Sequence, residues 1–145
     1  PGSALPDGLF LPEAPADAKP LAAARAEAKP GETVTFTGYI GGRAEPFTAD
    51  RAIVLVADTE KAPACTDQCT VPWDACCTAP AQIAANSATV QVVDAKGNML
   101  PVGLQGKGGL EPGAVVTVVG TVREANENVF IVDATGLAVE AMQQS

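Results

Sequence analysis

From residue 33 onward the sequence alternates between apolar and polar side chains, and this pattern constrains the fold more than any other. In TVTFTGYIGG (33–42), Val34, Phe36 and Ile40 lie on one face, and threonines and Tyr39 lie on the other. Such alternation is typical of a β-strand with one buried face. The glycine inside it indicates a bulge or a sharp bend. The chain is therefore expected to fold mainly as curved β-structure.

Similar patterns recur along the chain and predict four more strands. They are expected at 51–58, 88–94, 114–124 and 129–140. The connections are hairpin-sized or loops, which favours antiparallel pairing. The stretch 18–28 is rich in Ala, Leu, Arg and Glu, so it predicts one short helix before the first strand, with Asp17 as its N-cap. Glycines inside long strands indicate a small, strongly bent five-stranded antiparallel barrel.

The 145 residues suit one domain with a hydrophobic core. Residues 1–16 are rich in Pro, Ala and Gly, and we interpret them as a flexible N-terminal tether to a single domain at 17–145. Packing of Leu9, Phe10 and Leu11 on that domain is the alternative. No apolar stretch approaches the ~20 residues that a membrane span needs. We therefore expect no membrane insertion by this segment, and an N-terminal anchor stays open.

Two stretches carry a resemblance to a known fold. PGETVTFTGYIGG, followed later by GLEPGAVVTVVGTVREANENVFIVDATGLAV, resembles an OB-fold over roughly residues 30–140. More narrowly, IGGRAEPF, CTVPWDACC and ATVQVVD resemble a group of uncharacterised exported OB-fold proteins of planctomycete-type bacteria. The resemblance implies an OB-fold-like barrel and an exported protein, periplasmic or in the cell envelope. It implies no catalytic residues.

All four cysteines and the only tryptophan fall within CTDQCTVPWDACC (65–77). This motif lies in a long insertion between the second and third strands, residues 59–87, which we call the cysteine segment. Loops of that length need a reason to stay ordered. The even number of cysteines and their close spacing favour disulfide bonds. Since Cys76 and Cys77 are adjacent, their side chains diverge, and we expect them to bond Cys65 and Cys69 in either order. The insertion would then be stapled by disulfides.

The alternative for the same four cysteines is a metal-binding or electron-transfer site. Four thiolates can hold zinc or an iron–sulfur cluster. The spacing C-x3-C-x6-C-C is unlike the paired knuckles of zinc ribbons, and the chain has no histidine to complete a mixed site. Thiol–disulfide exchange with a partner is disfavoured because the nearby acidic residues oppose thiolate formation. We therefore expect no metal and no other cofactor.

Charge bears on the choice of partner. Nine Lys and Arg face seventeen Asp and Glu, and the net charge is −8. No two basic residues are adjacent, whereas a nucleic-acid surface needs clustered cations. The second and third strands also lack the aromatic platforms of nucleic-acid-binding OB-folds. We therefore predict no nucleic-acid binding.

The absence of histidine removes the commonest general base, so we expect no enzyme. The remaining hypothesis is a binding or interaction module for an unknown protein or small ligand. Its surface would combine the loop after the first strand with the cysteine segment, because both can approach the same side of the barrel. The candidate residues are Tyr39, Gly41, Gly42, Arg43, Phe47 and Trp73.

Overall fold

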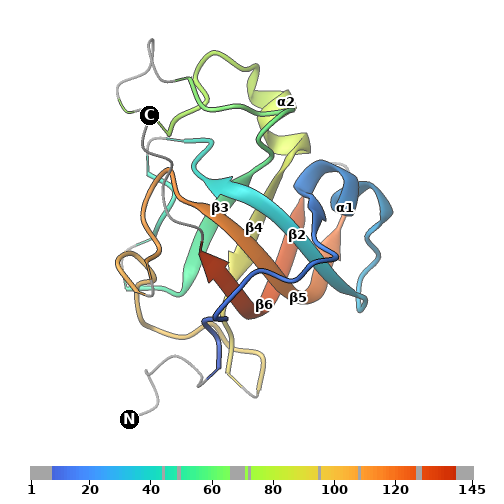
Figure 1. The fold of residues 1–145 in the computed structure, drawn as a ribbon, viewed down its shortest axis with the longest axis vertical. Coiled ribbons are helices and arrows are strands. Elements are labelled where there is room, and N and C mark those ends of the chain that lie inside the picture. The colour runs from blue at the N-terminus through green and yellow to red at the C-terminus, as the bar shows by residue number, and fades with distance from the viewer. Residues whose placement is uncertain are drawn as a thin grey trace.

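The structure is a computed structural model that describes residues 8–43, 45–48, 50–65, 71, 73–94, 96–107, 109–126 and 129–139. It is mainly β, with two short helices (Figure 1). The elements are β1 (Lys19–Pro20), α1 (Leu21–Glu27), β2 (Thr33–Ile40), β3 (Ile53–Ala57), α2 (Pro80–Ala85), β4 (Ser87–Gln91), β5 (Val115–Ala125) and β6 (Phe130–Val139).

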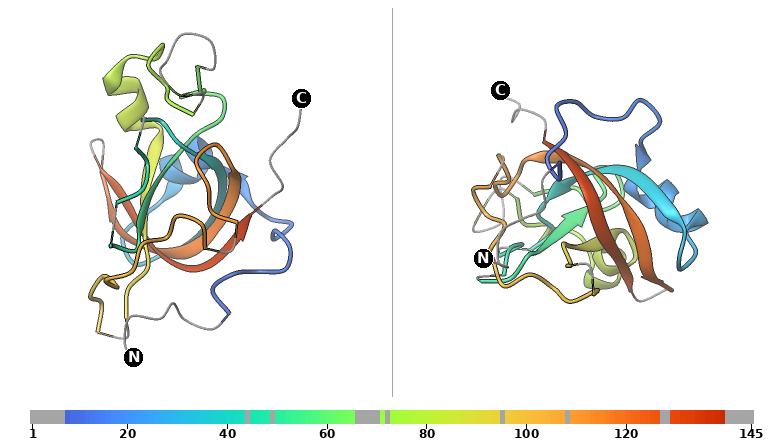
Figure 2. Two further views of the ribbon diagram at one scale, coloured as in Figure 1. Left: turned by 90° about the vertical axis from the view of Figure 1, so that its left-hand side faces the viewer. Right: turned by 90° about the horizontal axis from the view of Figure 1, so that it is seen from below.

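Strands β2 to β6 form a closed five-stranded barrel, as the sequence predicted (Figure 2). The strand order is β2-β3-β4-β6-β5, and β5 pairs with β2 from Thr33↔Thr121 to Tyr39↔Val115. The expectation of purely antiparallel strands was wrong, because β4 and β6 run parallel, with Thr89 opposite Ile131. The reason is geometric. Strand direction cannot alternate all the way around a ring of five, so at least one neighbouring pair must be parallel.

The barrel interior holds most of the side chains that the alternation assigned to it. Phe36 and Ile40 of β2 are fully buried, together with valines of β3, β4 and β5. Val34 is half-buried and packs against this core. In β6, Phe130 and Val132 are buried, while Ile131 between them is only half-buried. Both faces of this stretch are apolar, and a register shift in the β5–β6 pairing sets which face turns inward.

The predicted helix exists but is shorter at its start. Lys19 and Pro20 pair in parallel with β2 instead of entering the helix. Asp17 does not cap it. The buried carboxylate of Asp58, which follows β3, accepts a hydrogen bond of 2.8 Å from the backbone N–H of Ala22. An orphan donor of the first turn is thus satisfied by a residue distant in sequence, which local rules do not anticipate.

Residues 8–11 lie against the barrel. Leu9 is buried, and Leu11 donates a backbone hydrogen bond of 2.8 Å to Leu137 of β6. For this part of the predicted tether, the packing alternative therefore holds. The side chains add apolar contact to the core, which offsets the entropy lost on ordering this short stretch.

Candidate binding groove

Two glycines, Gly41 and Gly42, directly follow β2, and the cysteine segment packs against them. The N–H of Gly41 donates to the carbonyl of Leu55, and the N–H of Gly42 donates to the carbonyl of Trp73 at 2.9 Å. A Cβ on Gly41 would collide with that same Trp73 oxygen and with the ring of Tyr39. The absence of a side chain at Gly41 therefore permits the contact between the two segments.

Tyr39 lies beneath this contact, which corrects the expectation that it faces solvent. It is 5% exposed, and its hydroxyl donates to the carbonyl of Ala62 at 2.5 Å. Burial, together with the smaller effect of the negative charges of Asp74 and Asp58, raises the pKa of Tyr39 to about 12. Tyr39 thus anchors the start of the cysteine segment and is no part of an exposed surface.

The predicted disulfide is confirmed for Cys65 and Cys77, whose Cα atoms lie 5.9 Å apart. Cys76 is also disulfide-bonded, and Cys69 lies outside the described residues. Inside the closed loop, the N–H of Cys65 donates to the carbonyl of Asp74 at 2.8 Å. The disulfide therefore closes a loop that contains Trp73 and fixes the backbone on either side of it.

Phe47 and Trp73, two of the candidate residues, line one groove of about 500 Å³. Phe47 comes from the loop between β2 and β3, where it forms an isolated bridge with Val54. A third wall comes from the loop between β4 and β5. The lining residues are Glu45, Pro46, Phe47, Thr48, Asp50, Trp73, Gly103, Gln105, Lys107 and Pro112. The groove therefore combines aromatic and proline surfaces with charges of both signs.

Sequence reasoning missed the third wall of this groove. No residue of the stretch KGGLEPG (107–113) was among the candidates, although Lys107 and Pro112 line the groove. No local signal connects this turn to Trp73, more than thirty residues earlier in the chain. The contact depends on barrel closure, which brings loops from both halves of the sequence to one side.

Arg43 lies elsewhere, in a smaller pocket of about 190 Å³ that also includes Arg25, Leu55, Thr89 and Phe130. Arg25 donates to the carbonyls of Ala84, Ser87 and Asn126, at 2.5, 2.8 and 3.0 Å. Its guanidinium also lies 5.8 Å from the centre of the Phe130 ring. Burial lowers the pKa of Arg25 below its usual value. Its role is to join α1 to α2 and to the β5–β6 turn, which leaves few donors for a ligand.

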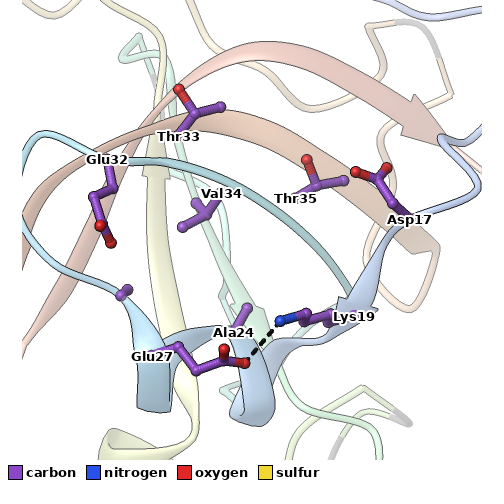
Figure 3. Close-up of a pocket in the computed structure, with 9 residues that line it drawn as sticks. Asp17, Lys19, Ala24, Glu27, Glu32, Thr33, Val34 and Thr35 are labelled. Carbon is purple, nitrogen blue, oxygen red and sulfur yellow. Dashed lines mark hydrogen bonds and ion pairs between the residues drawn. The ribbon is translucent and has the colours of Figure 1, made fainter.

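A further pocket of about 380 Å³ lies between α1 and β2 (Figure 3). Lys19 and Glu27 form an exposed ion pair of 2.8 Å within it. Figure 3 shows Asp17 and Glu32 at opposite ends, so these carboxylates do not converge on one point. Within the described part of the chain, the group of potential metal ligands that does converge is Cys65, Cys76 and Cys77, whose sulfurs lie within 4.8 Å of one another.

Among the described residues, no helix is both long and apolar enough to cross a membrane. Comparisons of the chain with protein-family models, with curated proteins and with solved structures found no match.

Proposed function

We propose that this chain is a non-enzymatic, exported OB-fold module that binds a protein or small ligand in the groove between Phe47 and Trp73. The strand order supports the fold assignment. The OB-fold is a five-stranded Greek-key barrel that binds ligands beside its first loop, and the groove borders the loop between β2 and β3.

The observation that carries the proposal is the convergence of Phe47 and Trp73 on one groove. Binding sites are concave and largely apolar, with a few polar groups that fix orientation. Here the aromatic rings and two prolines provide apolar contact, and Lys107, Gln105 and Asp50 provide polar contact. These features favour recognition of an extended peptide or a compact polar ligand with an apolar face.

A binding role is also favoured by the chemistry of the remaining groups. The chain contains no histidine, and Cys65, Cys76 and Cys77 are held in disulfides. Disulfides persist in oxidising compartments, which supports export to the periplasm or cell envelope. The net charge of −8 favours a partner other than nucleic acid.

Trp73 is the only tryptophan, so its fluorescence reports directly on the groove. We would titrate the protein with proline-containing peptides and, separately, with neutral oligosaccharides. A saturable change in Trp73 emission is expected with one panel. Phe47→Ala should weaken it, whereas Arg43→Ala, a matched control at the candidate residue outside the groove, should not. Equal effects of both substitutions, or no saturable change with either panel, would contradict the proposal.

The second candidate function is a metal or electron-transfer site, in which Cys65, Cys76 and Cys77, whose sulfurs converge, would bind an ion as thiolates once the disulfides are reduced. The two functions predict opposite states for the cysteines of the purified protein: disulfides for the binding module and thiolates for the metal site. Intact mass with and without reductant separates them, because each disulfide that opens adds two hydrogens. If chelator and denaturant alone release thiols that react with iodoacetamide, the metal site is supported and the stapled segment is contradicted.

A further inference from the structure

The edge of β6 carries an additional strand-like segment from the beginning of the chain. The N–H of Leu137 donates to the carbonyl of Leu9 at 2.7 Å, and the carbonyl of Leu137 accepts from the N–H of Leu11 at 2.8 Å. Phe10 and Leu137 thereby form a parallel bridge. Both backbone groups of Leu137 are used, as when an added peptide strand extends a sheet.

The side chains on either side of Phe10, those of Leu9 and Leu11, each pack into a defined position on the barrel. Leu9 is 1% exposed and belongs to the same core as Leu137. Leu11 lies over Gly136: a Cβ there would have three Leu11 carbons as its nearest neighbours, at 3.0 to 3.3 Å. The missing side chain of Gly136 thus makes room for Leu11. These two packing positions make the β6 edge complementary to an extended strand with the sequence pattern Leu-x-Leu.

The link between this segment and the rest of the fold is exposed and irregular. Residues 12–18 arch from β6 to α1 (Figure 2), and most of them are exposed. The backbone hydrogen bond recorded within this stretch is a long one, from Ala18 to Pro15 at 3.4 Å. Pro12 and Pro15 lack an N–H donor. Seven residues can extend over roughly 25 Å, so the segment can leave its position without unfolding the barrel.

We propose that the β6 edge is a docking site for an extended Leu-x-Leu strand, and that its occupant from outside the chain is the same segment, residues 8–11, of a second copy. Exchange of an identical element recreates the same hydrogen bonds and apolar contacts between two copies, so it costs little free energy as a route to a dimer. The net charge of −8 on each copy opposes the exchange, and salt reduces this repulsion. This site is separate from the groove of the proposed function.

Two complementary variants test the exchange. Leu9→Asp disables the segment but keeps the β6 edge, and Gly136→Val fills the packing position of Leu11 but keeps the segment. The backbone at Gly136 does not adopt a positive φ, so valine fits its conformation. By light scattering at high salt, each variant alone should have one chain mass of 14.6 kDa. Their equimolar mixture should form a species of twice that mass.

The control mixes Leu9→Asp with the double variant Leu9→Asp/Gly136→Val, which has no intact segment to donate and should remain at one chain mass. A synthetic peptide of residues 8–12 should dissociate the heterodimer. If Leu9→Asp does not fold by circular dichroism, the less buried Leu11→Asp replaces it. A mixture of folded variants that stays at one chain mass, or a heterodimer that the peptide leaves intact, would overturn the proposal.

Discussion

Removal of the Cys65–Cys77 disulfide gives the sharpest test of how the cysteine segment is held. The perturbation is the double substitution Cys65→Ser/Cys77→Ser, which removes both partners and leaves no unpaired thiol from this bond. The disulfide spans a sequence separation of 12. In the chain-entropy model, closing a loop of this size restricts the unfolded state by about 3 kcal/mol. The free energy of unfolding should fall by about that amount.

The barrel itself should survive the change. The disulfide lies outside the core, since Cys65 is half-buried and Cys77 is exposed. The cysteine segment also keeps two other contacts with the barrel: the bond from Gly42 to Trp73 and the bond from Tyr39 to Ala62. At roughly 2–4 °C per kcal/mol for a chain of about this size, the melting temperature should fall by roughly 6–12 °C.

Urea unfolding followed by far-UV circular dichroism measures the change in free energy, and hydrogen exchange locates it. Faster exchange is expected within residues 58–86, with the strands still protected. Wild-type protein in reductant, which opens every disulfide, should be at least as destabilised. Loss of strand signal without denaturant would show that the disulfide holds the barrel. A change below about 1 kcal/mol would show that the segment is ordered without it.

Other predictions concern the core, the buried tyrosine, the glycine contact and nucleic acid. Phe36→Ala should reduce the free energy of unfolding by about 3–5 kcal/mol, because Phe36 is fully buried against Phe130 at 5.9 Å between ring centres; a loss below about 1 kcal/mol in urea unfolding would contradict the packing. Because burial raises the pKa of Tyr39 to about 12, its contribution to stability should be complete below about pH 10 and lost as the pH rises to about 12. Tyr39 is the only tyrosine, so an ultraviolet absorbance titration measures this pKa directly; a midpoint near 10 in the folded protein would refute it. Gly41→Ala should disturb Trp73 fluorescence without ligand, whereas an unchanged spectrum would mean that the loop relaxes easily. Single-stranded DNA should not bind at physiological salt in a fluorescence anisotropy assay, and micromolar binding with a steep salt dependence would refute this.

The sequence predicts those parts of the fold in which local pattern and final environment agree. In β2, the alternation around Phe36 identifies both the strand and its buried face. In β6, Phe130, Ile131 and Val132 are all apolar, so the pattern identifies a strand but cannot choose its face. The choice depends on a register shift against β5, which is a property of the pairing and not of either strand.

The candidate site was predictable to a similar degree. Phe47 and Trp73 were proposed for one surface because their loops can approach the same side of the barrel, and both residues line the groove. Tyr39 was misplaced because its partners Ala62 and Asp74 belong to a segment whose path no periodicity indicates. A polar strand residue beside such a segment is buried when the segment folds back over it. Only the three-dimensional path of the cysteine segment carries that information.

The groove and the disulfide are linked through Trp73. The Trp73 carbonyl accepts from Gly42 of the first barrel loop, while the Cys65–Cys77 bond closes the loop that contains Trp73. Under the proposed function, a ligand that contacts Phe47 and Trp73 together should bind only chains in which the cysteine segment is packed on the barrel. Opening the disulfide should enlarge the population of chains in which the segment is not packed there, and apparent affinity should fall in proportion to the packed fraction. By the same linkage, a bound ligand should stabilise the packed state. Under the proposed function, the disulfide should therefore affect binding without contacting the ligand, because it limits the positions that Trp73 can occupy.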